Sequence, residues 1–207
     1  MSAAREDIMG RIREALGPGV AVPEVPRGYR GPRVEDGVVD RFCERVAEYR
    51  ATVTRIAPAD LADTVARLCR ERGAKRIAVP PGGLDALAGI EVVVDDPPLS
   101  PHALDRLDGV LTGCALAIAE TGTIVLDGGE RSGRRALTLV PDWHVCVVEP
   151  GSIVAGVPDA VAALAEAAAE GRPITLVSGP SATSDIELDR VEGVHGPRTL
   201  DVLVLRA

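Results

Sequence analysis

The residue best suited to chemistry in this sequence is Glu120, the one charged side chain in the apolar stretch at 117–126. Thr121, Gly122 and Thr123 follow it directly. A carboxylate in such a run is costly to bury unless it is paired or hydrogen-bonded, and the threonine hydroxyls and accessible N–H groups could supply those bonds. A partly buried carboxylate is suited to acid–base work or to service as a covalent nucleophile. The alternative is a carboxylate that Thr121 and Thr123 fix only to hold a turn.

A second polar segment, at 178–187, follows a predicted strand and opens with a glycine–proline turn. Exposed N–H groups at the carboxyl ends of parallel strands attract anions, so this loop predicts a ligand site. Ser184 and Glu187 have the spacing of a helix capping box, which explains them without a ligand. Asp185 is a catalytic candidate, like Glu120. The candidates for contact with a ligand are Gly179, Ser181 and Thr183 here, and Thr121, Gly122 and Thr123 in the first segment.

His195 lies in a glycine-flanked turn and is a candidate for acid–base work or for binding a carboxylate. The alternative is a histidine that hydrogen-bonds a loop carbonyl. Segments that meet beyond the carboxyl ends of strands form one pocket, so we expect Glu120, Asp185 and His195 to line a single cleft, within about 10 Å of one another. His144, at the head of a predicted strand at 145–148, is expected to be structural.

Three arginines stand in or beside the polar, glycine-rich stretch at 127–135. Arginine can clamp a carboxylate or phosphate with two parallel hydrogen bonds. A polar loop of this kind can equally be solvated or contact a partner. Of the three, Arg135 is the site candidate because it is nearest to the apolar segment that follows.

The composition limits the classes of function. The 207 residues carry a formal net charge of −8 and include one Trp, two Tyr and one Phe. A negative chain with so few aromatic side chains lacks both the cations that hold a phosphate backbone and the platforms on which bases stack, which argues against nucleic-acid binding. The core is expected to be aliphatic, because the apolar residues are mostly Ala, Val and Leu.

The cysteines do not have the pattern of a metal or iron–sulfur site. No two of them form a Cys-x-x-Cys pair, and each has apolar neighbours, as expected of reduced, buried thiols. We find no secretory leader at the start of the chain and no run of 18 apolar residues, which predicts a cytoplasmic protein without membrane insertion. The four residues are Cys43, Cys69, Cys114 and Cys146.

Two parts of the chain differ in pattern. Residues 1–37 are expected to form a helix at 3–16 and an extended, proline-rich arm. From residue 38 onward, helices and strands alternate with short connections, which favours a mostly parallel sheet covered on both faces. The expected elements are helices at 38–50, from Pro58 to about Gly73 and at 158–170, and strands at 51–56, 76–79, 90–94, 110–114, 117–119, 123–126, 145–148, 174–177 and 202–205.

Four motifs in the second half occur in a fixed order. They are Ala-Glu-Thr-Gly-Thr at 119–123, Pro-x-x-His at 141–144, Gly-Pro-Ser-x-Thr-x-Asp-Ile-Glu at 179–187 and Gly-Val-His-Gly-Pro at 193–197. In this order they resemble the LUD-domain proteins, specifically the lactate utilisation protein C family. The resemblance extends from about residue 38 to the end. One departure is Ala182, where many relatives carry an arginine that could serve as a cation for an anionic ligand.

The resemblance implies a three-layer α/β/α fold with some mixed strands, similar to the NagB/RpiA/CoA-transferase-like superfamily. It also implies a role in oxidising L-lactate to pyruvate, in a system whose iron–sulfur clusters belong to partner proteins and not to this chain. Two-electron oxidation needs an acceptor, and the sequence has no Gly-x-Gly-x-x-Gly fingerprint, so we expect no lactate oxidation by the chain alone. The leading hypothesis is therefore an auxiliary subunit with a site for a small anionic ligand. The alternatives are an independent CoA-transferase-like or sugar-phosphate-type enzyme that uses Glu120, and a non-catalytic interaction module.

Overall fold

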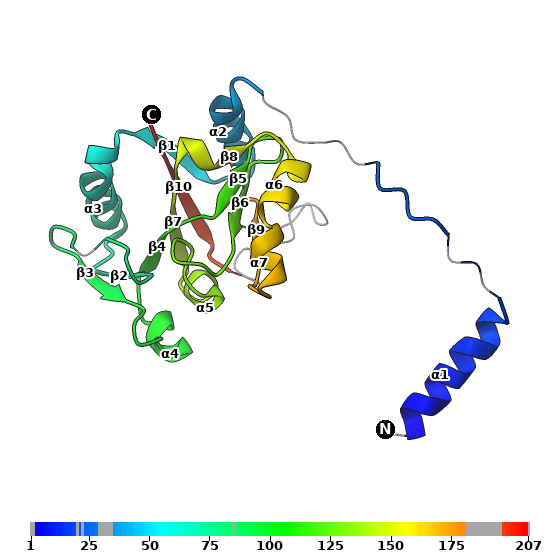
Figure 1. The fold of residues 1–207 in the computed structure, drawn as a ribbon. Helices are drawn as coiled ribbons and strands as arrows, with labels where there is room; N and C mark the ends of the chain where they lie inside the picture. Colours follow the sequence, from blue (N-terminus) through cyan, green and yellow to red (C-terminus); the bar gives the residue numbers. More distant parts are fainter. Residues whose placement is uncertain are drawn as a thin grey trace. The chain divides into compact units, whose positions relative to one another are not determined.

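The computed structural model describes residues 3–19, 21, 23–28, 35–84, 86–180 and 196–206 (Figure 1). The chain forms two compact units, residues 1–30 and 31–207. In the first unit, the predicted helix is confirmed as α1 (Ala3–Leu16), an amphipathic helix with no buried residue. Ile8, Ile12 and Leu16 are spaced four residues apart and are all exposed. The division of the sequence at residue 37 into an arm and a LUD domain stays a prediction.

The larger unit is built on a six-stranded sheet in which every pair of neighbours is parallel. Its central strands are nearly continuous apolar runs, as expected of strands that are covered on both faces. The predicted mostly parallel sheet is confirmed. In spatial order the strands are β1 (Thr52–Ile56), β10 (Thr199–Leu205), β7 (Trp143–Val148), β4 (Gly109–Gly113), β2 (Arg76–Val79) and β3 (Glu91–Val94).

A second, smaller sheet contains the other strands expected after residue 110. Its order is β8 (Ile153–Val154), β5 (Leu116–Ile118), β6 (Thr123–Leu126) and β9 (Thr175–Val177). The β5–β6 and β6–β9 pairs are antiparallel, whereas β5 and β8 are parallel. β9 therefore does not belong to the parallel sheet.

Helices flank the two sheets, which gives the α/β/α class expected from the sequence (Figure 1). Side chains of α3 (Leu61–Arg72) cover one face of the parallel sheet together with Trp143. On the opposite face, α2 (Val38–Glu48) and the small sheet share a core that includes Phe42. The remaining helical segments are η1 (Pro58–Asp60), α4 (Pro101–Asp105), α5 (Arg135–Leu139), η2 (Pro150–Ser152), α6 (Val157–Ala163) and α7 (Ala165–Ala169).

The prediction of a single helix at 158–170 is wrong, because this range forms two helices, α6 and α7. Leu164 separates α6 from α7 with φ −90° and ψ 2°, which lies outside the helical region. Its side chain is buried with Ala160 against the small sheet, in contact with β5 and β6 residues. The bend keeps both helices on that surface. The short helices α4 and α5 were not predicted, although Ser100 caps α4 by accepting a hydrogen bond from the N–H of Ala103.

The thiols are free, and three of the four are buried, as predicted for Cys69, Cys114 and Cys146. Cys43 is only partly buried and accepts a hydrogen bond from Arg55. Within the described residues, no helix is both long enough and apolar enough to cross a membrane.

Candidate functional site

Glu120 lies at the tip of the β5–β6 hairpin and is exposed to solvent. The prediction of a partly buried carboxylate is wrong, because the apolar residues on its two sides belong to separate strands that meet in a turn. The threonine hydroxyls do not fix the carboxylate either. Thr121 Oγ1 hydrogen-bonds to Thr123 Oγ1 at 2.7 Å, and Thr123 Oγ1 hydrogen-bonds to Ser178 Oγ at 2.8 Å.

These three hydroxyls, Thr121, Thr123 and Ser178, form a chain that joins the two polar segments singled out by the sequence. Both segments also pack against the C-terminal end of α2. Gly122, with φ +61°, would place a Cβ 2.6 Å from the carbonyl carbon of Arg45. Gly179, with φ +81°, would place one 2.6 Å from the Cβ of Tyr49. Glycine is required at both positions by the close approach of a helix.

Ser181, Thr183, Asp185 and His195 lie outside the described residues, so the predicted cleft of Glu120, Asp185 and His195 stays a prediction. The flanks of that segment are described, and a cavity of about 110 Å³ lies between them. We call it the amino-end cavity. Its walls include Thr138, Leu139, His144, residues 175–180, Gly196, Pro197 and Leu200.

The amino-end cavity lies at the opposite end of the parallel strands from the expected site. His144 and Leu200 both line it, and they are paired in register as the second residues of β7 and β10. The sequence predicted that the segment after β9 lies at the carboxyl ends of the parallel strands. For the described residues on either side of that segment, this prediction is wrong. The reason is that β9, which leads into this segment, runs in the small sheet, antiparallel to β6.

A different cavity, of about 380 Å³, lies at the carboxyl ends of β2, β4 and β7. It is lined by residues 80–84, Thr112, Gly113 and an ion pair between Arg131 and Glu149 at 3.0 Å. None of the predicted site residues that the structure describes lines this cavity.

His144 is 2% exposed and is held by a 2.8 Å hydrogen bond between its Nε2 and the hydroxyl of Thr112. Burial lowers the pKa of His144 to about 4, so the imidazole is neutral at physiological pH. The expectation of a structural histidine agrees with the Thr112 bond. The ring is also part of the wall of the amino-end cavity, which the sequence did not indicate.

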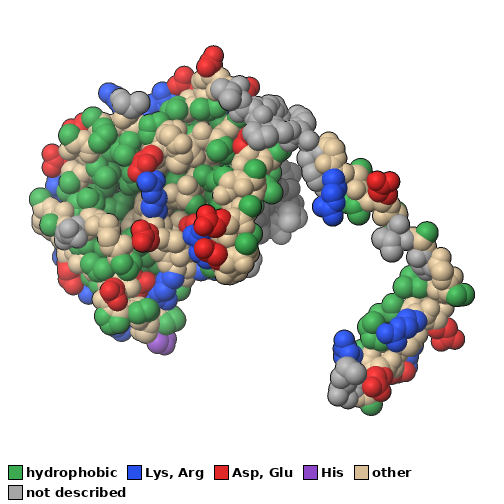
Figure 2. Space-filling model, viewed as in Figure 1, with side chains coloured by type: hydrophobic (Ala, Val, Ile, Leu, Met, Phe, Trp, Pro, Cys, Tyr) green, Lys and Arg blue, Asp and Glu red, His purple; other side chains and the backbone are tan. Residues whose placement is uncertain are grey.

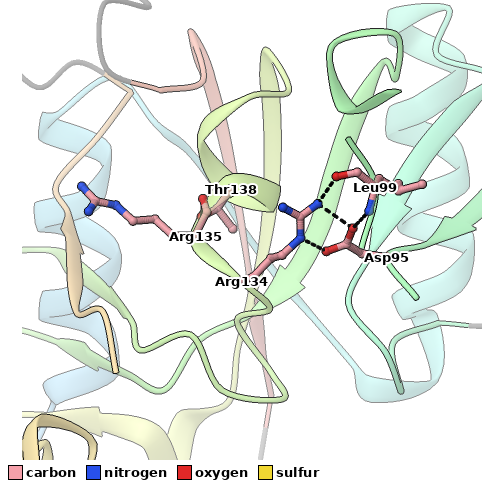
Figure 3. Close-up of polar contacts among 5 residues, drawn as sticks. All are labelled: Asp95, Leu99, Arg134, Arg135 and Thr138. Atoms are coloured by element: carbon pink, nitrogen blue, oxygen red, sulfur yellow. Dashed lines mark hydrogen bonds and ion pairs between the residues drawn. The ribbon is translucent and has the colours of Figure 1, made fainter. Parts of the chain in front are cut away.

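The adjacent arginines at the start of α5 have different surroundings (Figure 3). Arg134 donates through Nε and Nη2 to the two oxygens of Asp95, at 2.6 and 2.9 Å, and through Nη2 to the carbonyl of Leu99. The Asp95 hydrogen bonds raise the pKa of Arg134. Arg135 leaves the helix in the opposite direction and is exposed.

Arg135 differs from the other arginines available as a cation for an anionic ligand. Arg131 pairs with Glu149, Arg134 with Asp95, and Arg198 with Asp142 at 3.4 Å. In the described part of the chain, Arg135 has no ion-pair partner. It precedes Thr138 by three residues and therefore lies on the same side of α5 as this wall of the amino-end cavity.

Comparison with known proteins places these residues in a family. The family model of the LUD domain matches residues 101–205. A lactate utilization protein C of Deinococcus radiodurans is 49% identical over 188 residues, which cover 89% of this chain and 86% of the relative. The chain belongs to the LUD domain family.

Two further proteins are similar to this chain over most of its length. An uncharacterized protein of Neisseria meningitidis is 29% identical, over 98% of this chain and 94% of its own length. A crystal structure of a DUF162 family protein from Deinococcus radiodurans superposes with a TM-score of 0.71 at 42% identity, over 84% of this chain and all of that one. The residues matched by the LUD domain model include the hydroxyl chain, Arg135 and the walls of the amino-end cavity.

Charges of both signs are mixed on the face of the LUD domain drawn in Figure 2, where Lys and Arg side chains are interspersed with Asp and Glu. On the described part of that face, no continuous basic surface of the kind that tracks a phosphate backbone is visible. The net charge of −8 agrees.

The LUD domain is expected to lose stability in mild acid because of His144. The pKa of His144 is lowered from 6.5 to about 4 in the folded chain. At a pH between these two values, the unfolded chain therefore binds a proton that the folded chain does not. Stability must therefore fall as pH falls, and this residue alone should remove about 2 kcal/mol between about pH 8 and pH 5. Urea unfolding at both pH values measures the change. The His144→Gln variant should lose this part of the pH dependence, and an unchanged slope would assign it to other groups.

Proposed function

We propose that this LUD domain protein acts in lactate utilisation, as a cluster-free subunit of a system that oxidises L-lactate to pyruvate. The observation that carries the proposal is the 49% identity, over 89% of the chain, to a protein named lactate utilization protein C. The iron–sulfur clusters of the system are assigned to partner proteins, and the chain itself is assigned a site for a small anionic ligand.

The surroundings of the thiols support a chain without a cluster. Cluster ligation requires thiolates, and burial in apolar surroundings opposes their formation. Burial raises the pKa of Cys69. The pKa of Cys146 is raised by its hydrogen bond with Cys114 and by burial. Purified anaerobically, the chain is expected to be colourless and without stoichiometric iron.

The alternative of an independent enzyme using Glu120 has less support than the leading proposal. Glu120 is exposed at a hairpin tip, so burial does not raise its reactivity there. The interaction-module alternative explains the hydroxyl chain, which holds two segments together. It does not explain why a buried neutral histidine forms part of the wall of a cavity.

A complementation experiment tests the proposal. A Deinococcus radiodurans strain that lacks its lactate utilization protein C should regain growth on L-lactate when it expresses this chain. The same strain on pyruvate is the control, because a downstream defect would affect both carbon sources. Growth on pyruvate alone, with the chain present at normal levels, would contradict the proposal. Anaerobic purification from lactate-grown cells should yield iron–sulfur proteins with the chain, and the purified chain alone should not reduce a dye with lactate.

A further inference from the structure

The amino-end cavity has the size of a small metabolite. Its volume is about 110 Å³, which is the room taken by about four water molecules at liquid density. A molecule with three carbon and three oxygen atoms needs a similar space. Leu126, Leu139 and Leu200 give the cavity apolar walls, on which a methyl group can pack.

The wall carries the hydroxyls of Thr138, Thr175 and Ser178 and one aromatic ring, the neutral imidazole of His144. In the described structure, its one hydrogen bond is made by Nε2 with Thr112 Oγ1, at 2.8 Å, so Nδ1 is the nitrogen available to a ligand. A threonine hydroxyl can donate or accept. If it accepts from Nε2–H, Nδ1 accepts from a ligand hydroxyl. If it donates to Nε2, Nδ1–H donates to a ligand carbonyl. The Thr112–His144 pair can therefore bind both the alcohol and the ketone form of one compound.

A carboxylate inside the cavity would be costly, because no charged side chain is among its described lining residues. A cation without an ion pair among the described residues is on α5. Arg135 is exposed, has no ion pair within the described residues, and precedes the lining residue Thr138 by about one helical turn on the same face. A ligand with its carboxylate at the mouth would keep that charge solvated and close to the guanidinium.

We propose that the amino-end cavity binds a small 2-hydroxy or 2-oxo acid, with the 2-oxygen on His144 and the carboxylate at the mouth beside Arg135. This inference rests on the proposed function for the choice of lactate and pyruvate as probes. The cavity supplies the rest: its volume, its apolar wall, and a hydrogen-bonding group that can donate or accept.

Histidine NMR on the full chain tests the site directly. The chain has three histidines, so the ring signals of a ¹⁵N-histidine sample can be assigned by substitution. L-lactate and pyruvate should each shift the His144 signals in a saturable way. Propionate, which lacks the 2-oxygen, should bind at least about tenfold more weakly, because it leaves the imidazole without a partner. Shifts confined to His102, or equal affinity for propionate and lactate, would overturn the assignment.

Two arginine variants separate the site from general charge effects. Arg135→Gln should weaken lactate binding about tenfold, the usual size for one lost charged hydrogen bond at a partly exposed site. Arg131→Gln is the matched control, since Arg131 is paired with Glu149 and lines the cavity at the carboxyl ends. Equal losses in the two variants would overturn the role of Arg135. The His144→Gln variant should lose the preference for lactate over propionate, and a preserved preference would overturn the role of His144.

The outcomes also separate this inference from the proposed function. Restored growth on lactate without saturable binding at His144 would reject the cavity as the site and leave the role in lactate utilisation standing. Binding at His144 without complementation would support the cavity and reject that role.

Discussion

Replacing Arg134 by alanine is expected to lower the free energy of unfolding by about 3–5 kcal/mol, because it leaves a buried carboxylate without its cation. The carboxylate belongs to Asp95, which is 5% exposed. Arg134 contacts both of its oxygens and also the carbonyl of Leu99 (Figure 3). The N–H of Leu99 donates to the same carboxylate at 2.8 Å, but a single amide cannot replace a guanidinium. Urea unfolding of the chain and of the variant measures the loss.

The adjacent arginine provides the matched control. Arg135→Ala removes the same charge and a similar side chain one residue away, at an exposed position, and should change the stability by less than about 0.5 kcal/mol. A second variant tests the cause. Adding Asp95→Asn to Arg134→Ala should recover part of the lost stability, because it removes the uncompensated buried charge. Equal losses for the two arginine variants, or no recovery in the double variant, would contradict this account.

The contrast between Arg134 and Arg135 shows a limit of local sequence pattern. The sequence pattern favours Arg135 as the site candidate, because it is the arginine closest to an apolar segment. What distinguishes the two is the direction in which each leaves the helix. Asp95, the partner of Arg134, is 39 residues away in the chain. No periodicity within one segment identifies such a contact, since it depends on how β3 and α5 are placed by the sheet.

The secondary structure was easier to predict than the sheet topology, for a physical reason. Apolar periodicity identified β2 and β6 with their full bounds and α2 within two residues. Runs of three or four buried residues, however, fit equally well into either sheet. Pairing is decided by long-range contacts, as when β6 is hydrogen-bonded on its two sides by β5 and β9. The wrong assignment of β9 also moved the expected site to the wrong end of the parallel strands.

The same dependence on long-range contacts explains the surroundings of Glu120 and His144. Glu120 has apolar neighbours on both sides in sequence, which predicted burial, but a tight turn between two strands places it in solvent. His144 was expected to be structural and is buried, yet it also faces a cavity. That second property depends on Gly196 and Leu200, more than 50 residues later in the chain. A sequence reports the chemistry of a side chain more reliably than its surroundings.

Replacing Gly122 by alanine is expected to lower the free energy of unfolding by about 2–5 kcal/mol. Gly122 has φ +61°, a left-handed conformation that costs about 1–2 kcal/mol for a residue with a Cβ. The new Cβ would lie 2.6 Å from the carbonyl carbon of Arg45 and 2.7 Å from the nitrogen of Val46. These are backbone atoms of α2 that cannot rotate away, and overpacking of this kind costs about 1–3 kcal/mol more. Thermal or urea unfolding measures the sum.

A second glycine separates the two contributions. Gly171 has φ +72°, but a Cβ there would meet no atom within 4 Å. Gly171→Ala should therefore carry only the conformational cost, about 1–2 kcal/mol, so the excess loss in Gly122→Ala measures the contact with α2. That contact positions the hairpin whose Thr123 is bonded to Ser178, so lactate binding should weaken in Gly122→Ala and not in Gly171→Ala. Equal losses of stability would mean that the hairpin moves off α2 at no cost, and α2 would then have no role in placing the site.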